Sequence, residues 1–106
     1  MNIDFNKMLE QVQQMQGQME QAQEELKNET VQASAGGGMV TVTATGGGEI
    51  KEIRIDPKAI DPDDPELLAD LVTAAVNEAL RSAQSLMASK LGPALGGLQG
   101  LNLPGL

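Results

Sequence analysis

The chain of 106 residues contains no cysteine, histidine, tryptophan or tyrosine, and Phe5 is its single aromatic residue. Without cysteine and histidine, it has no thiolate nucleophile, no disulfide and none of the side chains that build structural zinc sites. The absence of histidine removes the usual general base near neutral pH. The shortage of aromatic rings removes a stacking platform for single-stranded nucleic acid. We therefore expect neither an enzyme nor a resident cofactor.

Acidic residues outnumber basic ones by 15 to 7, which gives a net charge of −8 and a pI near 4.3. No apolar run approaches the length of about 18 residues that spans a membrane. The first residues lack the charged and apolar regions of a signal peptide, and the lack of cysteine fits a reducing compartment. The composition predicts a soluble, cytoplasmic binding or structural protein with no membrane association and no small-molecule substrate.

Residues 4–28 are predicted to form one long helix, because apolar residues recur at alternating spacings of three and four. We call this stripe the seam, and its members are Phe5, Met8, Val12, Met15, Met19, Ala22 and Leu26. Asp4 is suited to cap the first turn, and Asn28 to take the left-handed conformation after the last turn. A helix of 25 residues spans about 37 Å and overhangs a globule whose radius of gyration is about 13 Å. The seam therefore predicts a homodimer interface; the alternative is that it packs only on its own sheet.

The following segment changes to a period of two, with β-branched residues between glycine triplets. The predicted strands and turns are strand 30–35, turn 36–38, strand 39–45, turn 46–48 and strand 49–55. The triplets lead into strands and not into helices, which favours hairpin turns over phosphate-binding loops. In the third strand Ile50 is out of phase with Ile53 and Ile55, so we expect a β-bulge near Ile50 or Lys51.

A second helix is predicted from Pro65, with Asp64 as its N-cap, because its apolar face is broad and rich in alanine. Leu91-Gly92-Pro93 is expected to end it. The acidic residues around its start are interpreted as helix caps and solvated charge, because they lack the spacing of a calcium loop. The fold class is therefore α+β, with the order helix, three-stranded antiparallel sheet, helix. The domain spans residues 1–91, and residues 92–106 form a flexible Gly/Pro/Leu-rich tail or dock on a partner.

Four runs of this sequence together resemble the YbaB/EbfC family of bacterial nucleoid-associated proteins. They are MLEQVQQMQ at 8–16, GGGMVTVT at 36–43, EIKEIRIDP at 49–57 and ELLADLVTAAVNEA at 66–79. The resemblance covers about residues 5–90 and is most specific from the third strand onward. It implies a tweezer-like homodimer whose helices are the prongs, which binds DNA and is located in the cytoplasm on the nucleoid. Family members carry several lysines on the first helix, where this chain has mostly glutamine.

An acidic chain repels the DNA polyanion at long range, so DNA binding requires a local basic patch that contacts backbone phosphates. The candidate contacts are Lys7, Lys27, Lys51, Arg54, Arg81 and Lys90. Each of them has an alternative reading as an ordinary solubilising surface charge. The first functional hypothesis is a dimeric nucleoid protein that contacts DNA backbone and shape and influences gene expression. The alternative is an acidic dimeric protein-interaction module without DNA binding.

Overall fold

The computed structural model describes the backbone of residues 4–99 and the side chains of residues 4–92. Its elements follow the predicted order. They are α1 (Phe5–Asn28), β1 (Thr30–Ala35), β2 (Val40–Thr45), β3 (Ile50–Ile55), the 3-10 helix η1 (Pro57–Ala59) and α2 (Pro65–Gln99). The α+β fold class is confirmed. In the described part of the chain, no helix has the length and apolar character to cross a bilayer.

Helix α1 begins as predicted and ends differently. The Asp4 carboxylate accepts a hydrogen bond from the backbone N–H of Lys7 at 3.2 Å, which confirms it as the N-cap. At the other end, Asn28 belongs to the helix and Glu29 follows it in extended conformation, with φ −91° and ψ 144°. The predicted left-handed turn at Asn28 is therefore wrong. The physical reason is that the chain passes straight into β1 and has no room for a reversal.

The three strands form an antiparallel sheet in the order β1-β2-β3. The expected bulge is confirmed: Thr43 pairs with Glu52 but Ala44 pairs with Ile50, which leaves Lys51 as the extra residue of β3. Because of this extra residue, Ile50 rejoins the face of the sheet that carries the other two isoleucines. Three consecutive glycines, Gly36 to Gly38, have φ values of 63°, 67° and 95°, which explains why the β1–β2 turn needs glycine.

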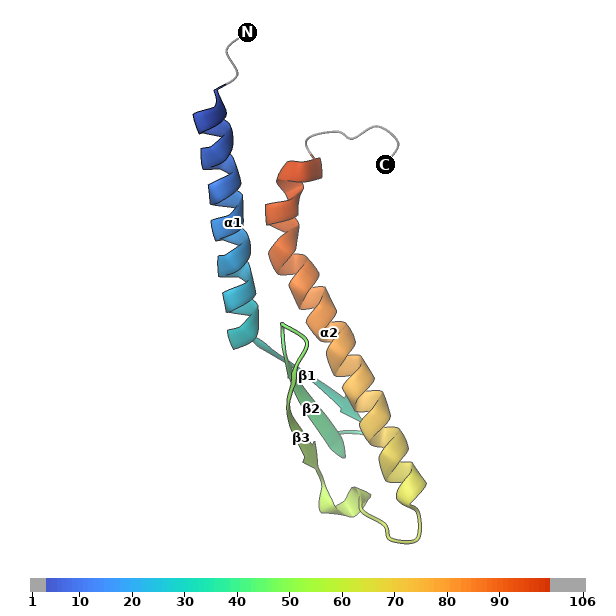
Figure 1. Ribbon diagram of the computed structural model, residues 1–106. Helices are drawn as coiled ribbons and strands as arrows, with labels where there is room; N and C mark the ends of the chain where they lie inside the picture. The colour runs from blue at the N-terminus through green and yellow to red at the C-terminus, as the bar shows by residue number, and fades with distance from the viewer. Residues whose placement is uncertain (1–3, 100–106) are drawn as a thin grey trace.

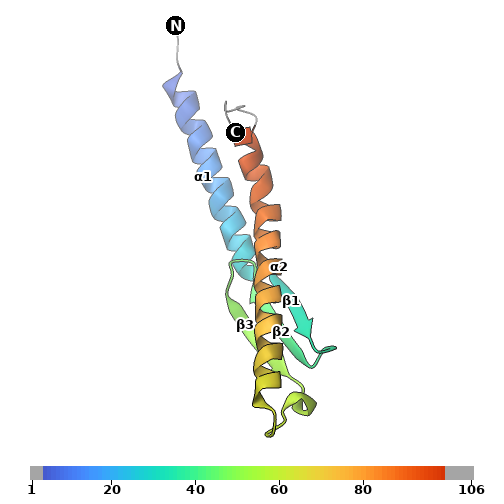
Figure 2. The same ribbon diagram turned by 90° about the vertical axis from the view of Figure 1, so that its right-hand side faces the viewer.

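Helix α2 crosses one face of the sheet (Figures 1 and 2). It packs over β1 and β2, and small residues make the contact. The fully or almost fully buried residues there are Ala33, Val40, Val42, Ala44, Ala75, Ala79 and Ala83. Alanines let the helix approach the sheet closely, as the alanine-rich face predicted. The N-cap is also confirmed, because the Asp64 carboxylate accepts from the Leu67 N–H at 3.2 Å.

The predicted end of the second helix is wrong. The helical backbone of α2 continues through Gly92 and Pro93 to Gln99. A proline in a helix removes one backbone donor and bends the axis, but it does not oblige the chain to leave the helix. Of the tail predicted from residue 92, residues 100–106 lie outside the described residues.

The molecule is long and narrow, with a radius of gyration of 20.5 Å and extents of 76 × 30 × 16 Å. A compact chain of this length has a radius of gyration of about 13 Å. The difference arises because α1 and the C-terminal half of α2 run side by side beyond the sheet (Figure 1). As the length argument predicted, much of α1 therefore projects from the body formed by the sheet and the first half of α2.

Candidate functional site

The seam of α1 lies in two environments. Ala22 and Leu26 are buried by the chain's own α2 and by the β2–β3 turn, and Leu26 is 2% exposed. These two residues, which the heptad pattern assigned to a dimer interface, belong instead to the core of a single chain. Exposure rises toward the N-terminus and reaches 50% at Val12 and 69% at Phe5. The outer seam, which we define as Phe5, Met8, Val12, Met15 and Met19, is left largely uncovered.

A second apolar surface, which is partly uncovered, lies on β3. The pairing places Ile50, Ile53 and Ile55 opposite Ala44, Val42 and Val40 respectively, all on the face that carries α2. Because α2 packs over β1 and β2, this isoleucine row is left beside the helix and not beneath it. Ile53 is 43% exposed although it is opposite the fully buried Val42. The alternation and the bulge were readable in the sequence, but the position of α2 over the other two strands was not.

Three of the six candidate DNA-contacting cations form salt bridges. Arg54 pairs with Glu52 at 3.0 Å, and Arg81 pairs with Glu78 at 2.8 Å. Both of these pairs are exposed and lie within one element, and such pairs hold their partners weakly. Their guanidinium groups are therefore free to exchange a carboxylate for another anion. Arg81 projects into solvent from α2, whereas Arg54 lies on the polar face of the sheet opposite Thr41.

Lys90 pairs with two carboxylates, whereas each of the arginines pairs with one. Its ammonium nitrogen lies 2.8 Å from Glu29 Oε1 and 3.1 Å from Glu25 Oε2, so it joins α2 to the end of α1. The side chain is 30% exposed. The hydrogen bonds to Glu29 and Glu25 raise the pKa of Lys90 above its ordinary value of 10.5. We call this arrangement the Lys90 clamp; it has a structural role that the sequence did not reveal.

The remaining three candidates, Lys7, Lys27 and Lys51, make no salt bridge within the described residues. Lys27 is in the last turn of α1 and lines a hollow of about 220 Å³ beside the β2–β3 turn, together with Thr45, Gly47 and Glu49. Lys51 is the bulged residue that follows this turn. The fold thus places two cations from distant parts of the sequence around one turn. Lys7 lies in the first turn of α1, at the end of the helix that is farthest from the sheet.

Negative charge lies both on α1 and at the opposite end of the molecule, and residues 4–29 contain six acidic and two basic residues. Residues 56–70 contain six acidic residues and one basic residue, Lys58, and form η1, the connector and the start of α2. In Figure 1 this end lies farthest from the tip of α1. Lys58, which is not one of the six candidate cations, is surrounded in sequence by this acidic stretch. Within the described residues there is no group of three or more carboxylates or other ligands arranged to hold a metal ion.

Comparison with known proteins identifies the family. The model of the YbaB/EbfC DNA-binding family matches residues 1–98. The chain belongs to the YbaB/EbfC DNA-binding family. A nucleoid-associated protein of Acetivibrio thermocellus is 54% identical over 103 residues, covering 97% of this chain and 89% of that protein. A nucleoid-associated protein of Saccharopolyspora erythraea is 50% identical over 109 residues, covering 97% and 94%.

The fold is shared with a solved structure. The crystal structure of an uncharacterized protein from Helicobacter pylori superimposes with a TM-score of 0.74 at 24% identity. The match covers 92% of this chain and 99% of that one. At this identity the likeness concerns the fold alone. The family resemblance found in the sequence is confirmed by the family match, which extends over nearly the whole chain.

Proposed function

We propose that this protein is a DNA-binding protein of the bacterial nucleoid that acts in the cytoplasm as a homodimer and contacts the phosphate backbone. Family membership over residues 1–98 carries the proposal, and the names of its relatives as nucleoid-associated proteins agree with it. The role is one of binding and not of catalysis. Occupancy of DNA by such a protein influences the expression of the genes it covers.

The isoleucine row is the surface we assign to the dimer. It is apolar and lies on the body of the protein, and in the single chain Ile50 and Ile53 are exposed while Ile55 packs partly against the core. A contact across it between two identical chains would be isologous, so that each row buries its copy. The outer seam is less suited to hold a dimer by itself, because it is only about two heptads long and stable coiled coils sustain three or four. In the resulting dimer the two α1 helices project from the shared body like prongs.

The phosphate contacts are assigned to the cations that the fold leaves available. Lys27 and Lys51 flank the β2–β3 turn, Lys7 lies at the prong tip, and Arg54 has only a weak competing partner. Lys90 is excluded because Glu25 and Glu29 hold its ammonium group. Arg81 is excluded because it projects from the side of α2 that faces away from the sheet. Because Lys7, Lys27 and Lys51 lie on α1 and beside the β2–β3 turn, away from the acidic stretch 56–70, DNA approaches the end that carries the prongs. Such contacts position the protein without reading base sequence.

The test measures DNA affinity as a function of salt. Fluorescence anisotropy with a labelled duplex gives the binding constant of the wild type and of Lys27→Gln/Lys51→Gln. The matched control is Lys58→Gln/Arg81→Gln, which removes the same charge from sites that we place outside the interface. Each phosphate contact that is removed makes the slope of log K against log salt less steep by about 0.9. Because the double substitution removes four such cations from a dimer, the expected change in slope is about 3.6.

Two results would contradict the proposal. The DNA-binding function fails if the wild type, at low salt, does not bind duplex DNA at tens of micromolar dimer. The site assignment alone fails if the control variant loses as much affinity and salt slope as Lys27→Gln/Lys51→Gln. Sedimentation of the isolated protein tests the dimer separately, and Ile53→Glu is expected to convert it to monomers.

A further inference from the structure

The outer seam remains uncovered in a dimer formed through the isoleucine row. The two surfaces belong to different elements, the outer seam to α1 and the isoleucine row to β3. Burying one therefore leaves the other exposed. An exposed stripe of this kind marks an interaction site more often than a passive surface.

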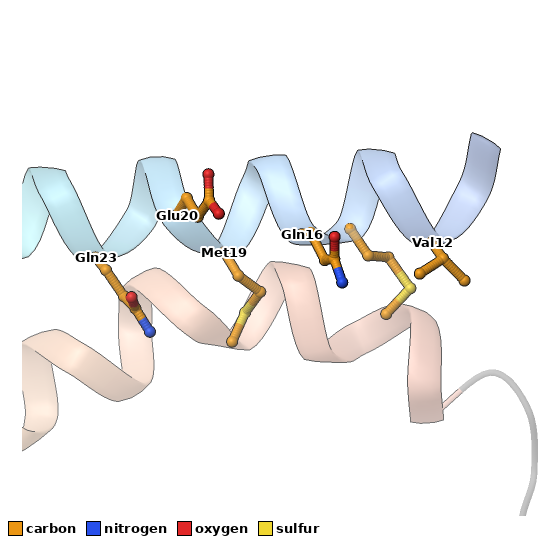
Figure 3. A pocket seen from close by; sticks show the side chains of 6 residues that line it. Val12, Gln16, Met19, Glu20 and Gln23 are labelled. Atoms are coloured by element: carbon orange, nitrogen blue, oxygen red, sulfur yellow. The ribbon is translucent and has the colours of Figure 1, made fainter. Parts of the chain in front are cut away.

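A groove runs along the outer seam where α1 faces the C-terminal half of α2. Its volume is about 590 Å³, and α1 lines it with Val12, Met15, Gln16, Met19, Glu20 and Gln23. Figure 3 shows Val12, Met19 and Gln23 projecting from α1 toward α2. The α1 lining consists of three apolar side chains, two amides and a single carboxylate. No cation of α1 lines this groove, so its chemistry favours an apolar partner rather than the DNA backbone.

We infer that the occupant of this groove is the outer seam of α1 from a second copy, so that dimers join to one another through their prongs. The first argument is length. The groove lining runs from residue 12 to residue 23, about 18 Å of helix, and the outer seam from Phe5 to Met19 covers about 22 Å. A helix of matching length and matching apolar spacing is therefore present in every copy of the chain.

The second argument is charge. The positions beside the outer seam are Leu9, Gln11, Gln16 and Gln18. None of these residues is ionised, and the Glu20 carboxylate is the single charge in the groove lining on α1, so like-charge repulsion between two identical prongs is small although each chain carries a net charge of −8. Charged flanks usually set partner choice in helix pairs, and the uncharged flanks here permit self-pairing. The glutamines of the two copies also supply donors and acceptors for each other.

The contact is weak by itself and becomes effective on DNA. Two heptads are too few for a stable coiled coil, and a dissociation constant of about 1 mM is the expected order for this contact. Dimers bound side by side on one duplex, or on two duplex segments, experience effective concentrations in the millimolar range. Prong contacts then link neighbouring dimers and make DNA binding cooperative. This part of the inference rests on the proposed DNA-binding function, whereas the contact between prongs does not.

The decisive variant is Val12→Gln/Met15→Gln. It replaces two apolar residues of the outer seam with glutamine, which leaves the net charge of the chain unchanged and is already common on this helix. The matched control is Gln14→Ala/Gln21→Ala, which changes exposed residues outside the seam. Sedimentation without DNA is measured from micromolar chain to about 1 mM. We expect the average mass of the wild type and the control to rise above that of the dimer at the highest concentration, and that of the seam variant to stay at the dimer.

The same three proteins are then compared on a short duplex that holds one dimer and on a long duplex that holds many. All three should bind the short duplex equally. On the long duplex, the Hill coefficient should fall from clearly above 1 in the wild type to about 1 in the seam variant, with a several-fold weaker midpoint. Since the chain has no cysteine, Val12→Cys gives a specific disulfide cross-link between prongs. It should appear between dimers on long DNA.

Three outcomes overturn the inference, and they differ from a failure of the proposed function. The first is a wild type that remains a dimer at about 1 mM without DNA. The second is unchanged cooperativity of the seam variant on long DNA. The third is a seam variant whose average mass at the highest concentration rises as much as that of the wild type. If none of the three proteins binds the short duplex, the DNA-binding function fails, while the concentration series still decides the prong contact.

Discussion

Replacing Gly46 with alanine tests how α1 is joined to the body of the protein. A Cβ atom at this position would lie 2.7 Å from Leu26 Cδ2, 2.9 Å from the Leu26 carbonyl oxygen and 3.1 Å from Leu86 Cδ2. The two methyl groups are able to move, but the carbonyl oxygen belongs to the backbone of α1. The substitution therefore pushes the last turn of α1 away from the β2–β3 turn. The hydrogen bond from the Gly46 N–H to the Glu29 carbonyl, 2.9 Å long, strains with it.

The magnitude follows from the cost of overpacking. Inserting a methyl group into a filled site costs about 1 to 3 kcal/mol, and contact with a rigid backbone atom places Gly46→Ala near about 2 kcal/mol. For a domain of this size, that loss lowers the midpoint of thermal unfolding by about 8 to 16 °C. The midpoint is measured by circular dichroism at one fixed chain concentration, because self-association shifts it.

The neighbouring Gly47 provides the control. A Cβ atom there meets only Thr45 Oγ1 at 3.7 Å, which is an ordinary contact. Gly47→Ala should therefore change the free energy of unfolding by no more than about 0.5 kcal/mol. Equal midpoints for the two variants would refute the assignment of the β2–β3 turn as the socket for α1.

The other predictions concern the caps, the core and the Lys90 clamp. Asp64→Ala should cost about 1 kcal/mol in chemical denaturation, because a cap of the core-forming helix is lost, whereas Asp4→Ala should only fray the exposed end of α1 in hydrogen exchange. Ala79→Leu should cost about 1 to 3 kcal/mol through overpacking against the sheet, and the exposed Ala74→Leu should be almost neutral. Similar losses in the free energy of unfolding for the two variants would contradict the packing of α2 on the sheet. Lys90→Met should lower the unfolding midpoint at neutral pH. Because folding raises the pKa of Lys90, its contribution is complete below about pH 10.5 and disappears as the pH rises through the higher pKa of the folded state. The midpoints of wild type and Lys90→Met should therefore converge in strong alkali, and a constant difference would contradict the clamp.

Most of the fold was readable in local patterns. The N-caps Asp4 and Asp64, the three strands and the bulge near Lys51 follow from spacing and residue type, because each depends on a few neighbouring residues. The two helix ends that were predicted incorrectly, at Asn28 and at Leu91-Gly92-Pro93, depend on where the chain goes next. Residue preferences at a helix end are weak compared with that constraint.

The candidate site was only partly readable. The sequence supplied the six cations and the seam, but it did not show that Glu25 and Glu29 would hold Lys90, since Lys90 and Glu25 are 65 positions apart in the chain. Nor did it show that Lys27 would lie beside the β2–β3 turn. The outer seam and the isoleucine row became distinguishable from the core only after the position of α2 was known.

By itself, the sequence determined the order of the elements, the stripe on α1, the alanine face of α2 and the family. These are set by periodicity and by the identity of neighbouring residues, which a single chain displays along its length. Only the tertiary structure decided which part of each apolar surface is covered and which cations are paired with carboxylates of the same chain. Burial and ion pairing depend on distances between residues far apart in sequence, and the packing of α2 over β1 and β2 sets those distances.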